Sequence, residues 1–590
     1  MIGSNYCLLS RGSAMGAVFA FASIACFSAC GAGSNDGGLS SSPNQDAGSD
    51  AVAQPDARES EPPGHTVKSL IVSPTNSLIE LDLNTTSSKQ FTVEGRFLDG
   101  ASEDLTDLVT WKLSLAGIGT MSGPTLNISA ATATGVRTTL ITAEYEGVSG
   151  QAQLTVVSYR MTGPQQDFFF VLPYQDTNGE QVKPLEFGST LKALDVFFNM
   201  DTTGSMSGEI NNLRTALVNQ IINPMQAQIP NTQFGAGEFQ DFPVERYGSH
   251  DDEDQPFKLR SVITADTNAV QAAVDAYQLG WGWDEPEAMI ESLYQIATGE
   301  GLAGPSPTYV APNHSGIGGV GFRQDSLPVI VTVSDAISHT VGETSTCSDT
   351  TNYEGEVAAA AHSRTQAKDA LAAICARVVG IASPEGYALP GCSAQSDEED
   401  FARATGALIP PSAWGSPRPS GCTASQCCTG LNGVGQTPDA DGLCPLVFVI
   451  NANGTGLGGS VITALQMLTR YGAFDVVTET VGEATALSGA YLPQGKTTAG
   501  FVKAVVPEWF EVPASPPGLT EPIIGETGFQ NVSPGTTLWF QVKVLNDFLE
   551  PGSSGQLFRA TIRVLAGGCA GLDEREVLIL VPPAELEEIK

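Results

Sequence analysis

The chain has 590 residues, a length that one hydrophobic core does not usually accommodate and that indicates about three or four domains. Its 65 acidic residues outnumber its 28 lysines and arginines, which gives a formal net charge of -37. This balance argues against a nucleic-acid partner, because phosphate recognition needs a basic surface. It suits an exported protein or a protein that binds cations.

The first 29 residues have the pattern of an export signal. Arg11 precedes the apolar stretch MGAVFAFASIACFSA (15–29), which is too short to span a bilayer. The small residues before Cys30 resemble a bacterial lipobox, in which the cysteine is lipidated after cleavage. A rival lipobox at Cys26 and an ordinary signal peptide are the alternatives. Because Gly31 resembles the outer-membrane sorting pattern, we expect an outer-membrane lipoprotein, anchored by its lipid alone and exposed at the cell surface.

The cysteines after position 30 form an even set, mostly clustered in the second half of the chain: Cys347, Cys375, Cys392, Cys422, Cys427, Cys428, Cys444 and Cys569. In an exported chain this pattern predicts disulfides, whose connectivity the sequence does not give. A zinc site at CTASQCC (422–428) is the alternative, but a second CxxC pair and nearby histidines are missing there.

Two regions precede the first strand–helix alternation. Residues 30–66 are rich in Gly, Ser, Asp and Pro and nearly lack large apolar side chains, which predicts a disordered tether. Residues 67–157 show short alternating segments between turns, which predicts a β-sandwich. The order FTVEGRFLDG, LVTWKLS, ITAEYEGVSGQAQLTVV resembles bacterial Ig-like group 2 domains, with Trp111 as the core tryptophan.

Residues 191–471 alternate between strand and helix patterns. Buried parallel strands are indicated by the apolar runs ALDVFFNM (193–200), LPVIVTVSD (327–335), RVVGIAS (377–383) and PLVFVI (445–450). Helical spacing occupies the segments between them, with Thr267 as the expected cap of one helix and Pro286 in the first turn of another. This alternation is typical of a doubly wound, Rossmann-type α/β domain.

Strand patterns flank that region on both sides. After residue 471 the helices stop, and residues 472–584 contain strand-like segments between Gly and Pro turns. Residues 158–190 are also strand-like, but this stretch is too short to fold alone. We therefore predict one β-sandwich, built from 158–190 and 472–584, into which the α/β domain is inserted.

Acidic and hydroxyl side chains gather where the expected strands end. Asp201 ends the first strand of the α/β domain and Asp335 ends another, and open α/β sheets bind ligands at this edge. The D-x-T-x-S spacing places Thr203 and Ser205 on the loop of Asp201. Such hard oxygen ligands suit Mg²⁺, Mn²⁺ or Ca²⁺ rather than Zn²⁺. The alternative is a helix start capped by Ser205 or Ser207.

These loops resemble a known family. DTTGSMS (201–207) and VIVTVSDA (329–336) are similar to the metal-ion-dependent adhesion site of von Willebrand factor A domains. Together with GAGEFQDFP (235–243), DEPE (284–287) and GFRQDSLPVIVTVSDAISH (321–339), they resemble more closely the inserted domain of integrin β subunits, and the flanking sandwich resembles the integrin hybrid domain. The resemblance implies that Glu287 joins Thr203 and Ser205 as metal ligands, with Asp201 and Asp335 binding directly or through water.

The same resemblance implies further cation ligands: Asp241, Asp284, the Pro286 carbonyl, Glu287 and, at a third site, Glu209. The alternative is that Asp241 and Asp284 only cap their own loops, and two departures from the family bear on the implied ligands. Gly282 stands where the family has an asparagine, and Gly208 with Glu209 stands where the family has two consecutive aspartates. His339 follows the loop of Asp335, and we expect it to pack beside that loop.

The features together predict a divalent-cation-dependent binding or adhesion protein, in which an Asp or Glu of a protein partner completes the metal coordination. In the family, ligand binding moves the last helix, here 458–472, and swings the hybrid domain. The alternative is a periplasm-facing scaffold in which the metal is structural. Catalysis is not expected, because a nucleophile–base pair, a P-loop and the motifs G-x-S-x-G and H-E-x-x-H are missing from the sequence.

Overall fold

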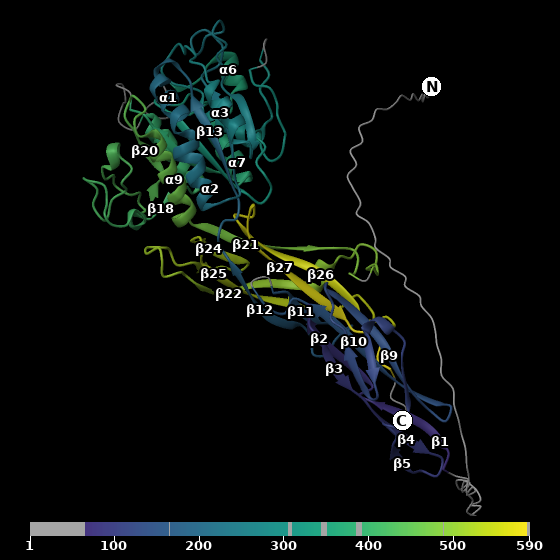
Figure 1. The fold of residues 1–590 in the computed structure, drawn as a ribbon. Helices are drawn as coiled ribbons and strands as arrows, with labels where there is room; N and C mark the ends of the chain where they lie inside the picture. The colour runs from purple at the N-terminus through teal and green to yellow at the C-terminus, as the bar shows by residue number, and fades with distance from the viewer. Residues whose placement is uncertain are drawn as a thin grey trace, which may run out of the picture. The chain divides into compact units, whose positions relative to one another are not determined.

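The structure is a computed structural model that describes residues 65–163, 166–304, 309–343, 351–384, 392–487 and 489–586 (Figure 1). The chain divides into two units, Met1–Pro62 and Pro63–Lys590, and every described residue belongs to the second. The expected signal peptide, Cys30, nearly all of the tether and Cys347 lie outside the described residues. In the described part of the chain, no helix is long and apolar enough to cross a membrane.

The first region is built from β-strands in three sheets. Their orders are β1 (Val67–Ser73), β4 (Thr92–Phe97), β5 (Ser102–Asp104); β2 (Asn76–Asp82), β10 (Val148–Tyr159), β9 (Gly135–Tyr145), β6 (Thr110–Leu113); and β3 (Ser87–Gln90), β8 (Thr125–Ile128), β7 (Gly119–Ser122). Burial alternates along β4, as a sheet with one buried face requires. Phe91 is fully buried, whereas Trp111 is only partly buried and packs against this core. Trp111 therefore borders the core rather than filling it.

Two further sheets combine strands from before and after the α/β region. One has the order β11 (Phe168–Val171), β27 (Ala570–Val581), β26 (Gln556–Ala566), β21 (Phe474–Gly482), β24 (Gly528–Val532), β23 (Ile523–Ile524). The other has the order β12 (Gln181–Gly188), β25 (Thr537–Val544), β22 (Val502–Glu511). β11 runs parallel to β27, and β12 runs antiparallel to β25. The chain thus contributes strands to these sheets on both sides of residues 191–471.

The α/β region is organised around a six-stranded sheet. The order is β15 (Lys258–Thr264), β14 (Thr232–Phe239), β13 (Leu194–Asp201), β16 (Leu327–Ser334), β17 (Arg377–Ala382), β20 (Val447–Val449). All neighbouring pairs are parallel except β14 with β15. β13 and β16 are buried along their whole length, as parallel strands covered on both faces must be. The α/β prediction is confirmed for this region, within a chain that is otherwise rich in β-strands.

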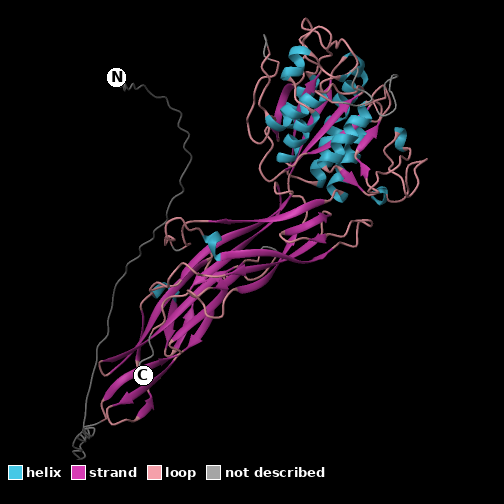
Figure 2. Cartoon of the chain, turned by 180° about the vertical axis from the view of Figure 1, so that it is seen from behind, coloured by secondary structure: helices cyan, strands magenta, loops and turns pink. Residues whose placement is uncertain are grey.

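Helices cover both faces of this sheet (Figure 2). Alternate residues of β13 point to opposite sides: Phe198 packs in the core with α1, α3 and α9, and Phe197 packs in the core with α4 and α7. The helices are α1 (Ser207–Ala216), α2 (Asn223–Gln228), α3 (Thr267–Asp275), α4 (Met289–Thr298), α6 (Gly355–Ala360), α7 (Arg364–Ala373), α8 (Ala394–Thr405) and α9 (Leu457–Tyr471), with a π-helical segment, η3 (Leu217–Ile222), after α1.

Two expected helix starts are wrong. α3 is capped by Asp266, whose carboxylate accepts the backbone N–H groups of Asn268 and Ala269, and Thr267 is its first helical residue. α4 begins at Met289 rather than near Pro286. Just before it, Glu287 forms a β-bridge with Ser338, and its backbone N–H donates to the Ile337 carbonyl at 2.9 Å. A contact between distant loops thus overrides the local helix preference.

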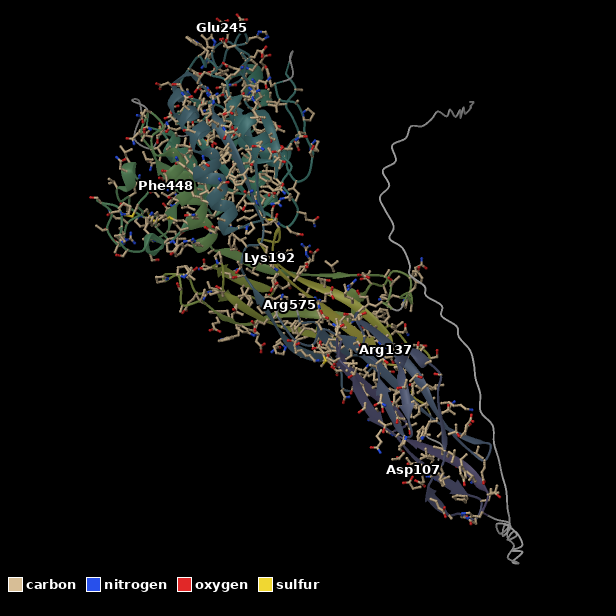
Figure 3. The ribbon with its side chains drawn as sticks, viewed as in Figure 1. Asp107, Arg137, Lys192, Glu245, Phe448 and Arg575 are labelled. Atoms are coloured by element: carbon tan, nitrogen blue, oxygen red, sulfur yellow. A yellow bond between two sulfur atoms is a disulfide. The ribbon has the colours of Figure 1, made fainter. Side chains whose placement is uncertain are left out.

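Disulfides and ion pairs brace the described part of the second unit. The disulfides are Cys375–Cys569, Cys422–Cys428 and Cys427–Cys444, and Cys392 is also disulfide-bonded. The disulfide prediction is confirmed, and the zinc alternative at 422–428 is wrong because its thiols are oxidised. Lys192 and Arg575, both labelled in Figure 3, each reach Oδ1 of Asp573, at 2.8 and 2.7 Å.

Candidate metal centre

The expected metal loops lie at the point where the strand order reverses. From β13 the chain proceeds to β14 and β15 on one side and then returns to β16 on the other side of β13. In open α/β sheets this switch point, at the carboxyl ends of the strands, forms a crevice for ligands. Asp201 is the last residue of β13, and Asp335 directly follows β16. The topology therefore brings together two acids that are 134 positions apart in the numbering.

Asp201 organises its own loop. Its Oδ1 accepts the Thr203 backbone N–H at 2.9 Å and the Thr203 hydroxyl at 2.7 Å. Its Oδ2 accepts the Ser334 hydroxyl at 2.7 Å. Burial raises the pKa of Asp201 to about 6, against these hydrogen bonds, and the nearby Glu209 charge raises it further. The carboxylate is thus held in place but is costly to ionise.

The helix-cap alternative fails on geometry. The Ser205 hydroxyl donates to Asp335 Oδ1 at 3.2 Å, across the switch point. α1 begins after Met206, whose side chain makes no capping hydrogen bond, and Thr203 makes none at the 3-10 turn before it. Thr203 and Ser205 therefore face the two carboxylates rather than the free N–H groups of α1.

Glu287 reaches the same region from a third loop. Its side chain is buried, and within the described residues its Oε2 accepts no hydrogen bond. A Cβ added to Gly282 would lie 3.0 Å from Glu287 Oε1 and 3.6 Å from Thr203 Cγ2, so these two side chains border the same small space. Burial raises the pKa of Glu287 well above its ordinary value, and the neighbouring charges that raise it further are carboxylates, those of Asp201 and Asp241 first.

This donor set fits a hard dication. Asp201, Thr203, Ser205, Glu287 and Asp335 present carboxylate and hydroxyl oxygens only, which are the ligands that Mg²⁺, Mn²⁺ and Ca²⁺ prefer. A buried carboxylate oxygen without a hydrogen bond normally requires an ion or another partner. The residues therefore fit the predicted divalent-metal site.

A second group of possible ligands lies beside the first. One ligand atom each from Asp241, Asp284 and His339 falls within 4.8 Å of the others, so these three could hold a metal ion. Pro286 is buried in the loop between them. Glu209 lies elsewhere, in the first turn of α1, where its Oε1 accepts the Ser383 hydroxyl at 2.7 Å.

His339 was not expected among these residues. It contacts both acids instead of only packing beside the loop of Asp335. Burial alone would lower the pKa of His339, but the Asp241 and Asp284 carboxylates outweigh this effect and raise it. The sequence signal was its position four residues after Asp335, on the loop that leaves the same sheet edge.

An exposed aromatic loop adjoins the site. The side chains of Trp281 and Trp283 are 70% and 58% exposed. The loop backbone is nevertheless fixed, because Gly280 donates to the Thr202 carbonyl at 2.8 Å and Trp281 donates to Asp254 at 3.3 Å. Glu245, labelled in Figure 3, lies at the opposite end of this region from the labelled Lys192.

The chain has only distant counterparts in these comparisons. No family model matches the chain, and no curated protein matches it. Among solved structures, it is similar to a von Willebrand factor type A protein from Catenulispora acidiphila, with 11% identity over 70% of this chain and 72% of that one and a TM-score of 0.28. It is also similar to the pilus adhesin SpaC from Lactobacillus rhamnosus GG in an open conformation, with 12% identity over 75% of this chain and 52% of that one and a TM-score of 0.26.

Proposed function

We propose that this chain is a divalent-cation-dependent protein-binding lipoprotein of the bacterial cell envelope, of the adhesion type. The observation that carries the proposal is the convergence of Asp201, Glu287 and Asp335 from three separate loops at the switch point, around two hydroxyls. A purely structural cluster of buried acids would be paired with basic side chains. Here the charges that act on Glu287 are carboxylates.

The side chains of the site prepare the two hydroxyls as ligands. Thr203 Oγ1 donates its proton to Asp201, and Ser205 Oγ donates its proton to Asp335. The lone pairs of both oxygens are therefore available to a cation. Thr203, Ser205 and Glu287 would hold the ion directly, and Asp201 and Asp335 would bind it directly or through water. A bound dication supplies positive charge with an exchangeable coordination position, which suits an Asp or Glu of a protein partner.

The surroundings support a macromolecular partner rather than a reaction. Trp281 and Trp283 present rigid apolar surface beside the site, and tryptophan is enriched among the residues that dominate protein interfaces. A cavity of about 190 Å³, lined in part by Glu285, Asp335 and Ser393, borders the site. We infer that a partner inserts an acid between these features, and that the protein is not an enzyme.

The finer architecture belongs to the same proposal. Residues 67–157 would form an Ig-like spacer, and residues 191–471 an integrin-β-like domain inserted in a hybrid-like sandwich. The strand pairing of β11 with β27 and of β12 with β25 supports this arrangement. Lipidation at Cys30 would anchor the protein in the outer membrane, with the tether holding the binding region away from the lipid.

Calorimetric titration of Mg²⁺, Mn²⁺ and Ca²⁺ into the purified chain tests the site. Asp201→Ala and Glu287→Ala should abolish binding there, because each removes an acid that the other residues cannot replace. Glu285→Ala is the matched control, since Glu285 is exposed and lies two positions from Glu287. Equal binding by the wild type and both site variants would refute the proposal.

Protease treatment of intact cells tests the location. A surface-exposed binding protein should be cleaved on whole cells, and a chain in lysed cells serves as the positive control. Complete protection on intact cells would favour the alternative, a periplasm-facing scaffold whose metal is structural.

A further inference from the structure

We propose that Asp241, Asp284 and His339 form a second metal site with mixed nitrogen and oxygen ligands, which takes a transition-metal dication of the zinc class in preference to Ca²⁺ or Mg²⁺. This ligand set differs from the all-oxygen set that the family resemblance implies, because it includes an imidazole. It does not depend on the proposed binding function, and it can be tested separately.

The imidazole of His339 is oriented as a ligand. Its Nδ1 lies 2.8 Å from the Thr351 carbonyl oxygen, and since a carbonyl only accepts, Nδ1 must carry the proton. In the neutral ring Nε2 then has a free lone pair, which faces Asp241 and Asp284. Histidines that bind metals commonly donate their other ring N–H to a backbone carbonyl in this way. Tyr353 stacks on the ring, with centroids 4.2 Å apart, and further restricts it.

Asp241 offers a carboxylate oxygen prepared for a cation. Its Oδ1 accepts the Tyr353 hydroxyl at 2.6 Å and the Phe242 backbone N–H. Its Oδ2 is buried, accepts no hydrogen bond within the described residues, and lies 3.2 Å from His339 Nε2. One oxygen of this fully buried side chain is thus fixed by its neighbours, and the other faces the imidazole nitrogen without accepting a hydrogen bond. A buried carboxylate oxygen without a hydrogen bond, aimed at an imidazole nitrogen, is what distinguishes the group from an ordinary cluster of acids.

The spacing of the ligand atoms suits a tetrahedral ion. His339 Nε2 lies 3.2 Å from Asp241 Oδ2 and 3.4 Å from Asp284 Oδ1. With zinc bonds of about 2.0–2.2 Å, neighbouring ligands of a tetrahedron are about 3.3–3.6 Å apart. Neighbouring ligands of octahedral Mg²⁺ would be closer, at about 2.9 Å. Ca²⁺ could match the spacing but prefers oxygen ligands. The imidazole nitrogen therefore favours a zinc-class ion over Ca²⁺.

The group is also accessible. The side chain of Asp284 is 30% exposed, whereas Asp241 and His339 are almost completely buried. Three protein ligands with one exposed edge leave room for a water or another group as the fourth ligand.

Equilibrium dialysis of the full chain against Zn²⁺, with metal content measured by mass spectrometry, tests the site. Excess Mg²⁺ keeps the all-oxygen centre from taking up zinc. We expect one zinc per chain in the wild type and at least about a 100-fold loss of affinity in His339→Asn. Asparagine can place its amide nitrogen near the position of Nδ1 and keep the hydrogen bond to Thr351. Asp284→Asn, at the exposed edge, provides a second variant that leaves the core unchanged.

The controls separate this site from the first one. His250→Asn removes an exposed histidine beside Asp251 and should leave zinc binding unchanged. Glu287→Ala should lose Mg²⁺ binding but keep zinc. Anomalous X-ray scattering at the zinc edge should place the ion between His339 Nε2 and the two carboxylates. Zinc binding that persists in both His339→Asn and Asp284→Asn, or Ca²⁺ binding at this position as tightly as zinc, would overturn the proposal.

Discussion

Replacing Asp201 by asparagine removes a buried charge while keeping the hydrogen bonds around it. The amide oxygen can still accept the two Thr203 donors that now reach Oδ1. The amide nitrogen can donate to Ser334 Oγ, whose own proton can turn to the Ala336 carbonyl at 3.3 Å. The variant therefore tests the charge of Asp201 rather than its packing.

The magnitude follows from the pKa of Asp201. Burial raises this pKa from 3.8 to about 6, a change of about 2 units, and each unit corresponds to about 1.4 kcal/mol. Between these two pH values the folded chain keeps a proton that the unfolded chain has lost, so the free energy of unfolding falls as pH rises from about 4 to about 6. Above pH 7, in a chelator, Asp201→Asn should therefore be more stable than the wild type by about 3 kcal/mol, and near pH 4 the two should be alike.

Scanning calorimetry in chelator at both pH values, and again with Mg²⁺ at pH 8, measures this effect. Mg²⁺ should raise the unfolding temperature of the wild type and leave Asp201→Asn unchanged. Asp266→Asn, at the exposed cap of α3, is the control and should behave as the wild type. A lower stability of Asp201→Asn than of the wild type at pH 8 in chelator, or equal stabilisation of both proteins by Mg²⁺, would refute this role of the Asp201 charge.

Three further outcomes are expected. Because burial raises the pKa of Glu287, metal binding near pH 6 should release protons. The binding enthalpy should then change with the ionisation enthalpy of the buffer, and the metal affinity should rise with pH. A binding enthalpy that is the same in every buffer would contradict this. Gly282→Ala should lower the Mg²⁺ affinity measured by titration, because its Cβ would lie 3.0 Å from Glu287 Oε1. Gly123 has nearly the same φ but open space around it, so Gly123→Ala should cost only about 1–2 kcal/mol of stability in denaturant unfolding. Removing the Cys375–Cys569 disulfide, which joins residues 194 apart, should lower the unfolding temperature. Chain entropy limits the loss in the free energy of unfolding to about 5 kcal/mol. An unchanged unfolding temperature would mean that the unfolded chain is already constrained.

The strand ends could be predicted because their signals are local. A run of apolar residues followed by an acid marks both β13 and β16, and the carboxyl ends of parallel strands share one edge. The hydroxyls of Thr203 and Ser205 followed from their spacing. What the sequence did not determine is whether they cap a helix or face carboxylates, because that depends on where Asp335, on another strand, comes to lie.

The misses arise where distant segments pair. The loop before α4 is held by its hydrogen bond to Ile337, which no local preference for a helix start reveals. The same pairing brings His339 to the acids, since its backbone N–H donates to the Glu287 carbonyl at 2.8 Å. His339 is therefore positioned by the backbone of the Glu287 loop, and its side chain contacts Asp241 and Asp284. Its role could be read only once the two loops were seen together.

The two groups of acids balance their buried charge in different ways. Asp241 and Asp284 have the imidazole of His339, which carries a positive charge when protonated, so this group can persist without a metal. Asp201 accepts hydroxyl and backbone donors, whereas Glu287 Oε2 accepts no hydrogen bond, and within the described residues neither carboxylate forms an ion pair with a basic side chain. Burying carboxylates without a countercharge costs several kcal/mol, and protonation or an external dication must offset that cost. At neutral pH the first centre should therefore need its ion far more than the second does, which is the property that a cation-dependent binding site requires.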